Sequence, residues 1–193
     1  MIRSPDELLV EQCREGRPAA LAEVCRRHRA LICSLARRVA GGAADLDDVV
    51  QDTLVAIVTG IRRFRGEAKL STWIAGTTVR VALRHAQRRG RESRRLASLD
   101  EGTLPLPDCE SPAGDPVQAA ETHEFLGRLE VAISALAPEH RAVVALRHIE
   151  EMSVEEIAQA LSLPIGTVKS RLHHARRALR QLMEPYLAMP GER

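Results

Sequence analysis

Basic and hydrogen-bonding side chains gather at the start of a helical segment near the C-terminus. Apolar residues recur with helical spacing from residue 165 to 183. The outward positions of the first turns hold Thr167, Lys169, Ser170, Arg171, His173 and His174. Side chains of these types bind phosphate oxygens and base edges in a major groove. The spacing therefore indicates a DNA-binding surface, and the alternative is a helical hairpin with a solvated basic face.

The residues before this segment complete a helix-turn-helix pattern. Ser153 and Glu156 have the spacing of a capping box, and the apolar residues of 154–161 then fall on one face of a two-turn helix. A tight turn follows at 162–164. A short helix, a tight turn and a longer helix with a basic outer face are typical of helix-turn-helix DNA-binding domains.

A second basic segment lies in the first half of the chain. Residues 61–95 hold eleven Lys and Arg against two acidic residues, although the formal net charge of the whole chain is only +2. The side chains expected to neutralise phosphates are Arg65, Lys69, Arg80, Arg84 and Arg88. Phe64 and Trp73 have the chemistry to stack on bases. However, Trp73 leads an apolar stripe that predicts a core position, and Phe64 is expected to anchor the loop. Two basic segments beside apolar helix faces favour a nucleic acid as partner.

The apolar periodicity predicts an all-α chain of two small helical domains joined by a flexible linker, the C-terminal domain being the helix-turn-helix. The expected domains are residues 1–91 and 117–187, with an acidic, Pro/Gly-rich linker at 92–116 and a tail at 188–193. Helices are expected, after a short first one, near 18–40, 45–63, 71–89, 117–136, 138–149, 154–161 and 165–183. No alternation long enough for a sheet occurs, so α/β enzyme folds are poor candidates.

Several classes of protein are excluded by what the sequence lacks. No apolar run approaches the roughly 20 residues that cross a bilayer, so no membrane insertion is expected. The start MIRSPDELLV has no apolar signal core, so we expect a cytoplasmic protein. The cysteines show no C-x-x-C pair and are expected to be buried, reduced thiols: Cys13, Cys25, Cys33 and Cys109. No phosphate loop, nucleophile–base cluster or metal-ligand spacing is visible, so we expect neither an enzyme, a cofactor nor a metal site.

Three stretches resemble the extracytoplasmic-function sigma factors of bacterial RNA polymerase. Residues 135–182 (ALAPEHRAVVALRHIEEMSVEEIAQALSLPIGTVKSRLHHARRALRQL) are similar to the promoter-reading C-terminal domain of that family. Residues 45–57 (DLDDVVQDTLVAI) and 64–74 (FRGEAKLSTWI) are similar to its N-terminal domain. The two sets occur in the family's order and spacing, and the resemblance extends over about residues 18–183.

The resemblance implies a transcription initiation factor whose partners are core RNA polymerase, promoter DNA and an anti-sigma factor. The positions matching the surface that docks on the clamp coiled coil of the largest subunit are Asp48, Gln51 and Asp52; the flap is a second polymerase contact. Asp48 and Asp52 share a helix face. Acidic residues stabilise the positive end of the helix dipole only in the first turn, so this alternative role does not explain Asp52, which lies beyond it. The helix-turn-helix would read the minus-thirty-five element, and residues 64–80 with the following helix would trap unstacked minus-ten bases.

Two positions depart from the family pattern. Arg80 stands where many relatives have Asn, which bears on base preference in the minus-ten element. Ser162 occupies a turn position often held by Gly; a positive φ there costs about 1 kcal/mol relative to Gly. The alternative function is a stand-alone helix-turn-helix regulator or adaptor whose first domain binds a protein partner without initiating transcription.

Overall fold

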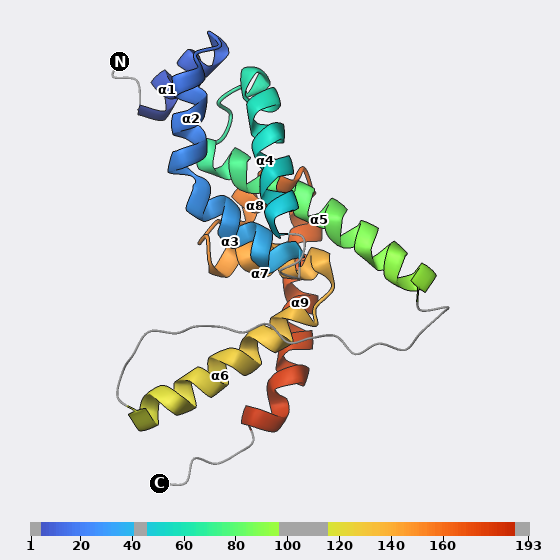
Figure 1. The fold of residues 1–193 in the computed structure, drawn as a ribbon. Helices are drawn as coiled ribbons and strands as arrows, with labels where there is room; N and C mark the ends of the chain where they lie inside the picture. The colour runs from blue at the N-terminus through green and yellow to red at the C-terminus, as the bar shows by residue number, and fades with distance from the viewer. Residues whose placement is uncertain (1–4, 41–45, 97–115, 188–193) are drawn as a thin grey trace.

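The computed structural model describes residues 5–40, 46–96 and 116–187, and every regular element within these ranges is a helix. In chain order these are α1 (Pro5–Arg14), α2 (Pro18–Arg27), α3 (Arg29–Ala40), α4 (Leu46–Gly60), the 3-10 turn η2 (Ile61–Arg63), α5 (Leu70–Leu96), α6 (Pro116–Ser134), α7 (Pro138–His148), α8 (Val154–Leu161) and α9 (Ile165–Leu187). The expected all-α fold is confirmed (Figure 1). Cys109 and most of the expected linker lie outside the described residues.

The expected single helix over 18–40 is wrong, because the chain bends at His28 and forms two helices. Apolar residues of α2, such as Val24, pack with α1 in one cluster, whereas Leu35 and Val39 of α3 belong to another. Ile32 of α3 lies in the same cluster as Val24, so α3 contributes to both clusters. The break is a local one, because the backbone of His28, with φ −102° and ψ 9°, leaves the helical conformation and ends α2.

Helix α5 is longer than the sequence predicts. It begins at Leu70 and continues to Leu96, past the expected end at residue 89 and through Gly90. Gly90 therefore does not end the helix. Threonine side chains on this helix bond back to the preceding turn: Thr77 Oγ1 donates to the Trp73 carbonyl and Thr78 Oγ1 to the Ile74 carbonyl, both at 2.9 Å.

The helix-turn-helix is confirmed, with the short helix over the expected residues. The Glu156 amide donates to Ser153 Oγ at 3.0 Å, and the Ser153 amide donates to Glu156 Oε2 at 2.9 Å, which completes the capping box. The hydrogen bond from the Ser153 amide is the main cause that lowers the pKa of Glu156. At the other end of α8, Ser162 takes a left-handed conformation with φ 54°. This is the left-handed conformation in which serine costs about 1 kcal/mol relative to glycine.

Replacing Ser162 with glycine is expected to stabilise the protein by about 0.5–1 kcal/mol, because glycine adopts a positive φ without the steric cost that serine has. The midpoint of thermal unfolding, followed by circular dichroism, checks this. Replacement by valine, which tolerates this conformation poorly, is expected to lower the midpoint. An unchanged midpoint in both variants would contradict the assignment of strain to this residue.

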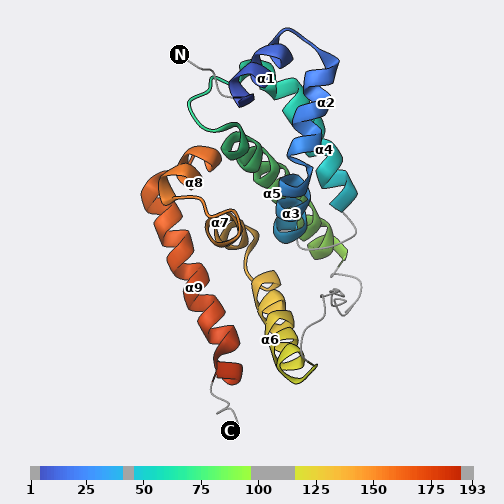
Figure 2. The same ribbon diagram turned by 90° about the vertical axis from the view of Figure 1, so that its left-hand side faces the viewer.

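The two groups of helices pack against each other. One continuous apolar core takes residues from α3, α4 and α5 and from α7, α8 and α9, including Val79 and Leu146, both fully buried. Figure 2 shows α7 and α8 lying beside α3 and α5, while α6 and the second half of α9 extend away from the rest of the molecule. The sequence predicts two domains, and the structure adds that they share a core.

Candidate nucleic-acid interface

The six residues singled out on the second helix of the helix-turn-helix all lie in the first turns of α9. Lys169, Ser170, His173 and His174 are exposed, and Thr167 and Arg171 are half-buried. Their apolar neighbours Val168, Leu172 and Ala175 are buried. The ring of His174 also stacks on that of His140 at the start of α7, with the ring centroids 6.1 Å apart. The helix therefore buries one side and presents the polar side to solvent.

The acidic residues of α4 form an exposed surface on the other domain. Asp48, Gln51 and Asp52 are all exposed, and Asp52 Oδ2 lies 2.8 Å from Nε2 of His85 on α5. Val55 continues the exposed strip one turn further and is 62% exposed. Val55 lies four residues after Gln51 and three after Asp52, so helical spacing places it on the same face, and this is the signal that could have found it. The exposed strip of α4 is thus acidic at its start and apolar further along.

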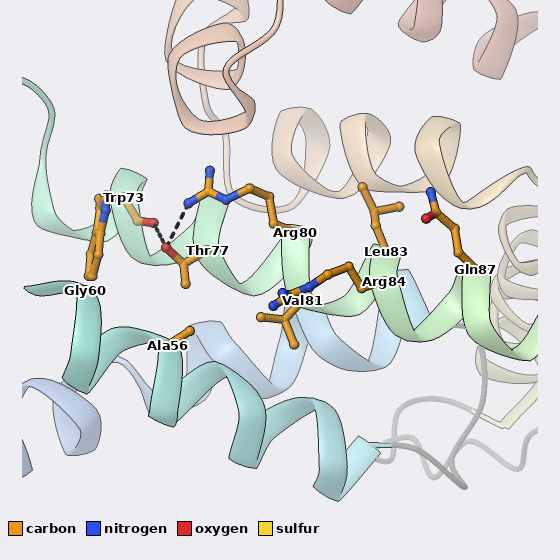
Figure 3. A pocket seen from close by; sticks show the side chains of 9 residues that line it. All are labelled: Ala56, Gly60, Trp73, Thr77, Arg80, Val81, Leu83, Arg84 and Gln87. Atoms are coloured by element: carbon orange, nitrogen blue, oxygen red, sulfur yellow. Dashed lines mark hydrogen bonds between the residues drawn. The ribbon is translucent and has the colours of Figure 1, made fainter.

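All the residues expected to bind the minus-ten element are exposed: Arg65, Lys69, Arg80, Arg84 and Arg88. Arg84 and Arg88 lie one turn apart on α5, and Arg65 and Lys69 lie in the loop before it. Arg84 helps to line a pocket of about 550 Å³ between α4 and α5 (Figure 3). Lys69 Nζ lies 3.6 Å from Glu156 Oε1 of α8, so one of the four already contacts the C-terminal domain.

Arg80 has a different environment from the other four. Its Nη1 donates to the carbonyl oxygen of Ala160 in α8 at 2.6 Å, and its Nη2 donates to Thr77 Oγ1 at 3.1 Å. Figure 3 shows its side chain directed toward Thr77, away from α4, whereas Arg84 lies on the α4 side of the helix. Burial lowers the pKa of the Arg80 guanidinium, and neighbouring Arg84 adds to this effect. Arg80 is thus an exposed residue whose guanidinium joins α5 to α8 through the Ala160 carbonyl.

The two aromatic residues of this region pack on each other. The ring centroids of Phe64 and Trp73 are 5.4 Å apart. Phe64 is buried in the core of the N-terminal domain and anchors the loop as expected, whereas Trp73, expected in the core, is only half-buried. A side chain at Gly60 would place its Cβ 3.1 Å from the Trp73 ring, so the glycine leaves room for the indole against the end of α4. The exposed part of Trp73 lines the α4–α5 pocket in Figure 3.

Both domains match models of known protein families. The model of sigma-70 region 2 matches residues 24–92, and that of sigma-70, region 4 matches residues 126–179. The RNA polymerase sigma-H factor of Pseudomonas aeruginosa is 28% identical over 193 residues, covering 97% of this chain and 98% of its own. The ECF RNA polymerase sigma factor SigW of Bacillus subtilis is 29% identical over 178 residues, covering 89% and 93%. This chain belongs to the extracytoplasmic-function sigma factors.

The fold of this sigma factor is also similar to solved structures of sigma factors in complexes. The sigma factor RpoE of Bartonella quintana, solved with the anti-sigma factor NepR, superposes with a TM-score of 0.65 at 20% identity, over 84% of this chain and 96% of that one. CnrH, solved with the cytosolic domain of CnrY, gives a TM-score of 0.63 at 23% identity, over 94% and 99%. As a sigma factor, the protein directs RNA polymerase to promoters in transcription initiation.

Two further observations concern only the described residues. No described helix has the length and apolar character needed to cross a membrane. In the same ranges, no three His, Cys, Asp or Glu side chains come together in a way that could hold a metal ion. Of the cysteines described, Cys13 is buried as expected, but the expected burial is wrong for Cys25 and Cys33, which are half-buried.

Proposed function

We propose that the two helical domains divide the work of promoter recognition, residues 1–91 binding polymerase and the minus-ten element and residues 117–187 binding the minus-thirty-five element. The observation that carries this proposal is the polar first part of α9, where donors and cations stand on the side opposite the buried Val168 and Leu172. Recognition helices of this architecture enter the major groove with their N-terminal residues toward the bases. Thr167, Lys169, Ser170, Arg171, His173 and His174 form this reading surface.

The minus-ten surface consists of α5 and the loop before it. Arg65, Lys69, Arg84 and Arg88 neutralise phosphates of the non-template strand, and Arg80 joins them when it is free of Ala160. Unstacking a base costs a few kcal/mol, which a basic groove and a complementary pocket offset, so the strand is captured in its unpaired form. This mechanism needs no covalent step and no hydrolysis. The sigma factor is therefore proposed to act by binding alone, not as an enzyme.

The acidic strip of α4 is proposed to bind the clamp coiled coil of the largest polymerase subunit. Asp48, Gln51 and Asp52 are exposed on it, and opposite charges between two helical surfaces guide their association. Since polymerase and promoter DNA lie in the bacterial cytoplasm, we place the protein there. The flap of the polymerase, contacted by the C-terminal domain, and an anti-sigma factor are the other proposed partners.

Run-off transcription tests the proposal as a whole. Purified core polymerase is incubated with genomic promoter fragments, with and without the sigma factor. New discrete transcripts that depend on the protein are expected, and their start sites identify both promoter elements. A protein that binds these fragments but neither binds core polymerase nor yields a transcript would instead be a stand-alone DNA-binding regulator.

Replacing Lys169 or Arg171 with alanine is expected to lower transcription from these promoters about tenfold or more, because each lost base or phosphate contact costs about 1–3 kcal/mol. Run-off product per unit time is the measurement, and a core polymerase pull-down is the control, expected to remain as in the wild type. Gln181→Ala, an exposed change on the far part of the same helix, should leave transcription unchanged. Normal output from both basic-residue variants would count against this reading surface.

A further inference from the structure

Helix α1 lies outside the segment that matches the sigma-70 region 2 model, which begins at residue 24. It nevertheless packs on the N-terminal domain, with Leu9, Val10 and Cys13 buried in the same cluster as Ile61 and Phe64. Figure 2 shows α1 beside the connection between α4 and α5. The helix therefore contacts the residues that lead into the loop proposed to capture DNA, although the proposed function assigns no residue of α1.

A polar contact reinforces this packing at the C-terminal end of α1. Nη2 of Arg14 donates a hydrogen bond to the carbonyl oxygen of Phe64. The turn after α1 lies against the same segment, because a Cβ atom at Gly16 would lie 3.3 Å from Nη2 of Arg62. Gly16 has φ 78°, and its amide donates to the Cys13 carbonyl at 3.0 Å. The end of α1 is thus fixed next to η2.

The carbonyl group that Arg14 contacts belongs to the first peptide group of the loop. Phe64 is 8% exposed, and its amide donates to the Ile61 carbonyl at 3.1 Å, so both its ring and its backbone are held. The Phe64 carbonyl and the Arg65 amide share one planar peptide group. A donor on that carbonyl therefore fixes the direction in which the chain leaves the core toward Arg65.

The loop beyond Phe64 is exposed until α5 begins. The side chains of Arg65 and Glu67 are 84% and 71% exposed and lie 3.9 Å apart, and an ion pair this exposed contributes little to stability. Gly66 has φ 76°, and a Cβ atom there would meet no atom within 4 Å. Leu70, 3% exposed, is the next residue buried in the core. Within the N-terminal domain, the direction set at Phe64 is therefore the main restraint on Arg65.

We propose that Arg14 is a positioning residue for capture of the minus-ten strand: its hydrogen bond to the Phe64 carbonyl holds Arg65 in the orientation that meets a DNA phosphate. The inference rests on the proposed function of the loop and α5, and it gives α1 a part in that function. Arg14 acts through Arg65 and does not contact the DNA itself. Such preorganisation raises affinity, because the loop loses less conformational freedom when the strand binds.

Arg14→Met tests this role, because it removes the donor and keeps a long unbranched side chain on the exposed side of α1. Its matched control is Arg17→Met, which removes the same charge from an exposed arginine of the next turn, where Arg17 pairs with Glu15 at 2.8 Å. Both variants are expected to keep the thermal unfolding midpoint and the dissociation constant for core polymerase of the wild type. These two measurements show that the variants fold and form holoenzyme.

The deciding measurement is the binding of holoenzyme to a fluorescein-labelled single strand, followed by anisotropy. The strand carries the non-template minus-ten sequence of a promoter identified by run-off transcription. Arg14→Met is expected to weaken binding about fivefold, as for the net contribution of one hydrogen bond, and Arg17→Met is expected to bind as the wild type does. Equal affinity of the wild type and both variants overturns the inference.

A double-mutant cycle separates positioning from a general loss of charge or stability. Arg65→Ala is expected to weaken strand binding about tenfold in the wild type but only about twofold in the Arg14→Met background, because the two residues act as one unit. Arg88→Ala is the control: Arg88 lies about 27 Å beyond Leu70 along α5, at 1.5 Å per residue, so its effect should be the same in both backgrounds. Additive effects of Arg14→Met and Arg65→Ala would show that Arg14 does not act through the loop.

Failure of the proposed function gives a different pattern. In that case the wild-type protein supports no run-off transcription, and with core polymerase it binds no random-sequence single strand, so the inference falls with its premise. If instead the wild type transcribes and Arg65→Ala weakens strand binding, while Arg14→Met matches the wild type, the loop binds DNA and only the role of Arg14 is refuted.

Discussion

Core polymerase is expected to bind the double variant Asp48→Arg with Asp52→Arg at least about 100-fold more weakly than it binds the wild type. The change places two cations on the exposed strip of α4, and like charges set against each other in an interface cost several kcal/mol. The dissociation constant, measured by fluorescence anisotropy with labelled sigma factor, checks this result. Transcription at a fixed sigma concentration should fall with it.

Two controls separate the loss of this surface from other effects of the substitutions. Glu7→Arg with Glu11→Arg introduces the same charge change at the same helical spacing on the exposed face of α1, and should retain binding. His85→Gln removes the partner of Asp52 without touching α4, and should retain binding too. Normal affinity in the Asp48 and Asp52 double variant would assign the polymerase-binding surface elsewhere.

Replacing Arg141 with methionine is expected to lower the free energy of unfolding by about 2–4 kcal/mol, because buried carbonyl groups lose a charged donor. Arg141 is 6% exposed; its Nη1 donates to the Ser134 carbonyl at 2.7 Å, and its Nη2 donates to the Val39 carbonyl at 3.0 Å. Burial lowers the pKa of this guanidinium, with nearby Arg89 contributing. The side chain thus links the ends of α6 and α3 from within the core.

Urea unfolding followed by circular dichroism measures this effect. Arg147→Met is the matched control on the same helix, because Arg147 is exposed and makes one hydrogen bond, to the Met152 carbonyl at 2.8 Å. Its loss should cost less than about 1 kcal/mol. If the two variants unfold at the same urea concentration, the buried hydrogen bonds of Arg141 do not contribute as proposed.

Local signals in the sequence predicted local structure well. The capping box at Ser153 and Glu156 fixes the start of α8, and the turn at Ser162 fixes its end, so both boundaries of that helix could be read from the residues. The exposure of Asp48 and Asp52 followed from their helical spacing in the same way. In each case the interacting groups lie within a few residues of each other.

Contacts between distant segments could not be predicted from residue type. Arg80 was assigned to DNA because it is a cation in a basic segment, but its main partner is a carbonyl group 80 residues further along the chain. Gly76 gave no signal of its own, yet a Cβ atom there would lie 2.2 Å from the Ala160 carbonyl oxygen, so only glycine permits this approach of α8. Nothing in the sequence near Arg141 distinguishes it from an exposed arginine of an amphipathic helix. It is buried because α7 packs against α3.

The break at His28 could not be predicted from the sequence either. The apolar residues keep helical spacing on both sides of it, and only the backbone conformation of His28 separates α2 from α3.

The contacts that close the molecule also determine when during synthesis it can close. The pairs formed by Val39 with Arg141 and by Ser34 with Glu150 are separated by 102 and 116 residues. Because a chain leaves the ribosome from its N-terminus, α3 and α5 emerge long before the helices that cover them. The nascent chain therefore exposes the faces of α3 and α5 on which α7 and α8 later pack, and this packing is a late, long-range step that loop-closure entropy slows.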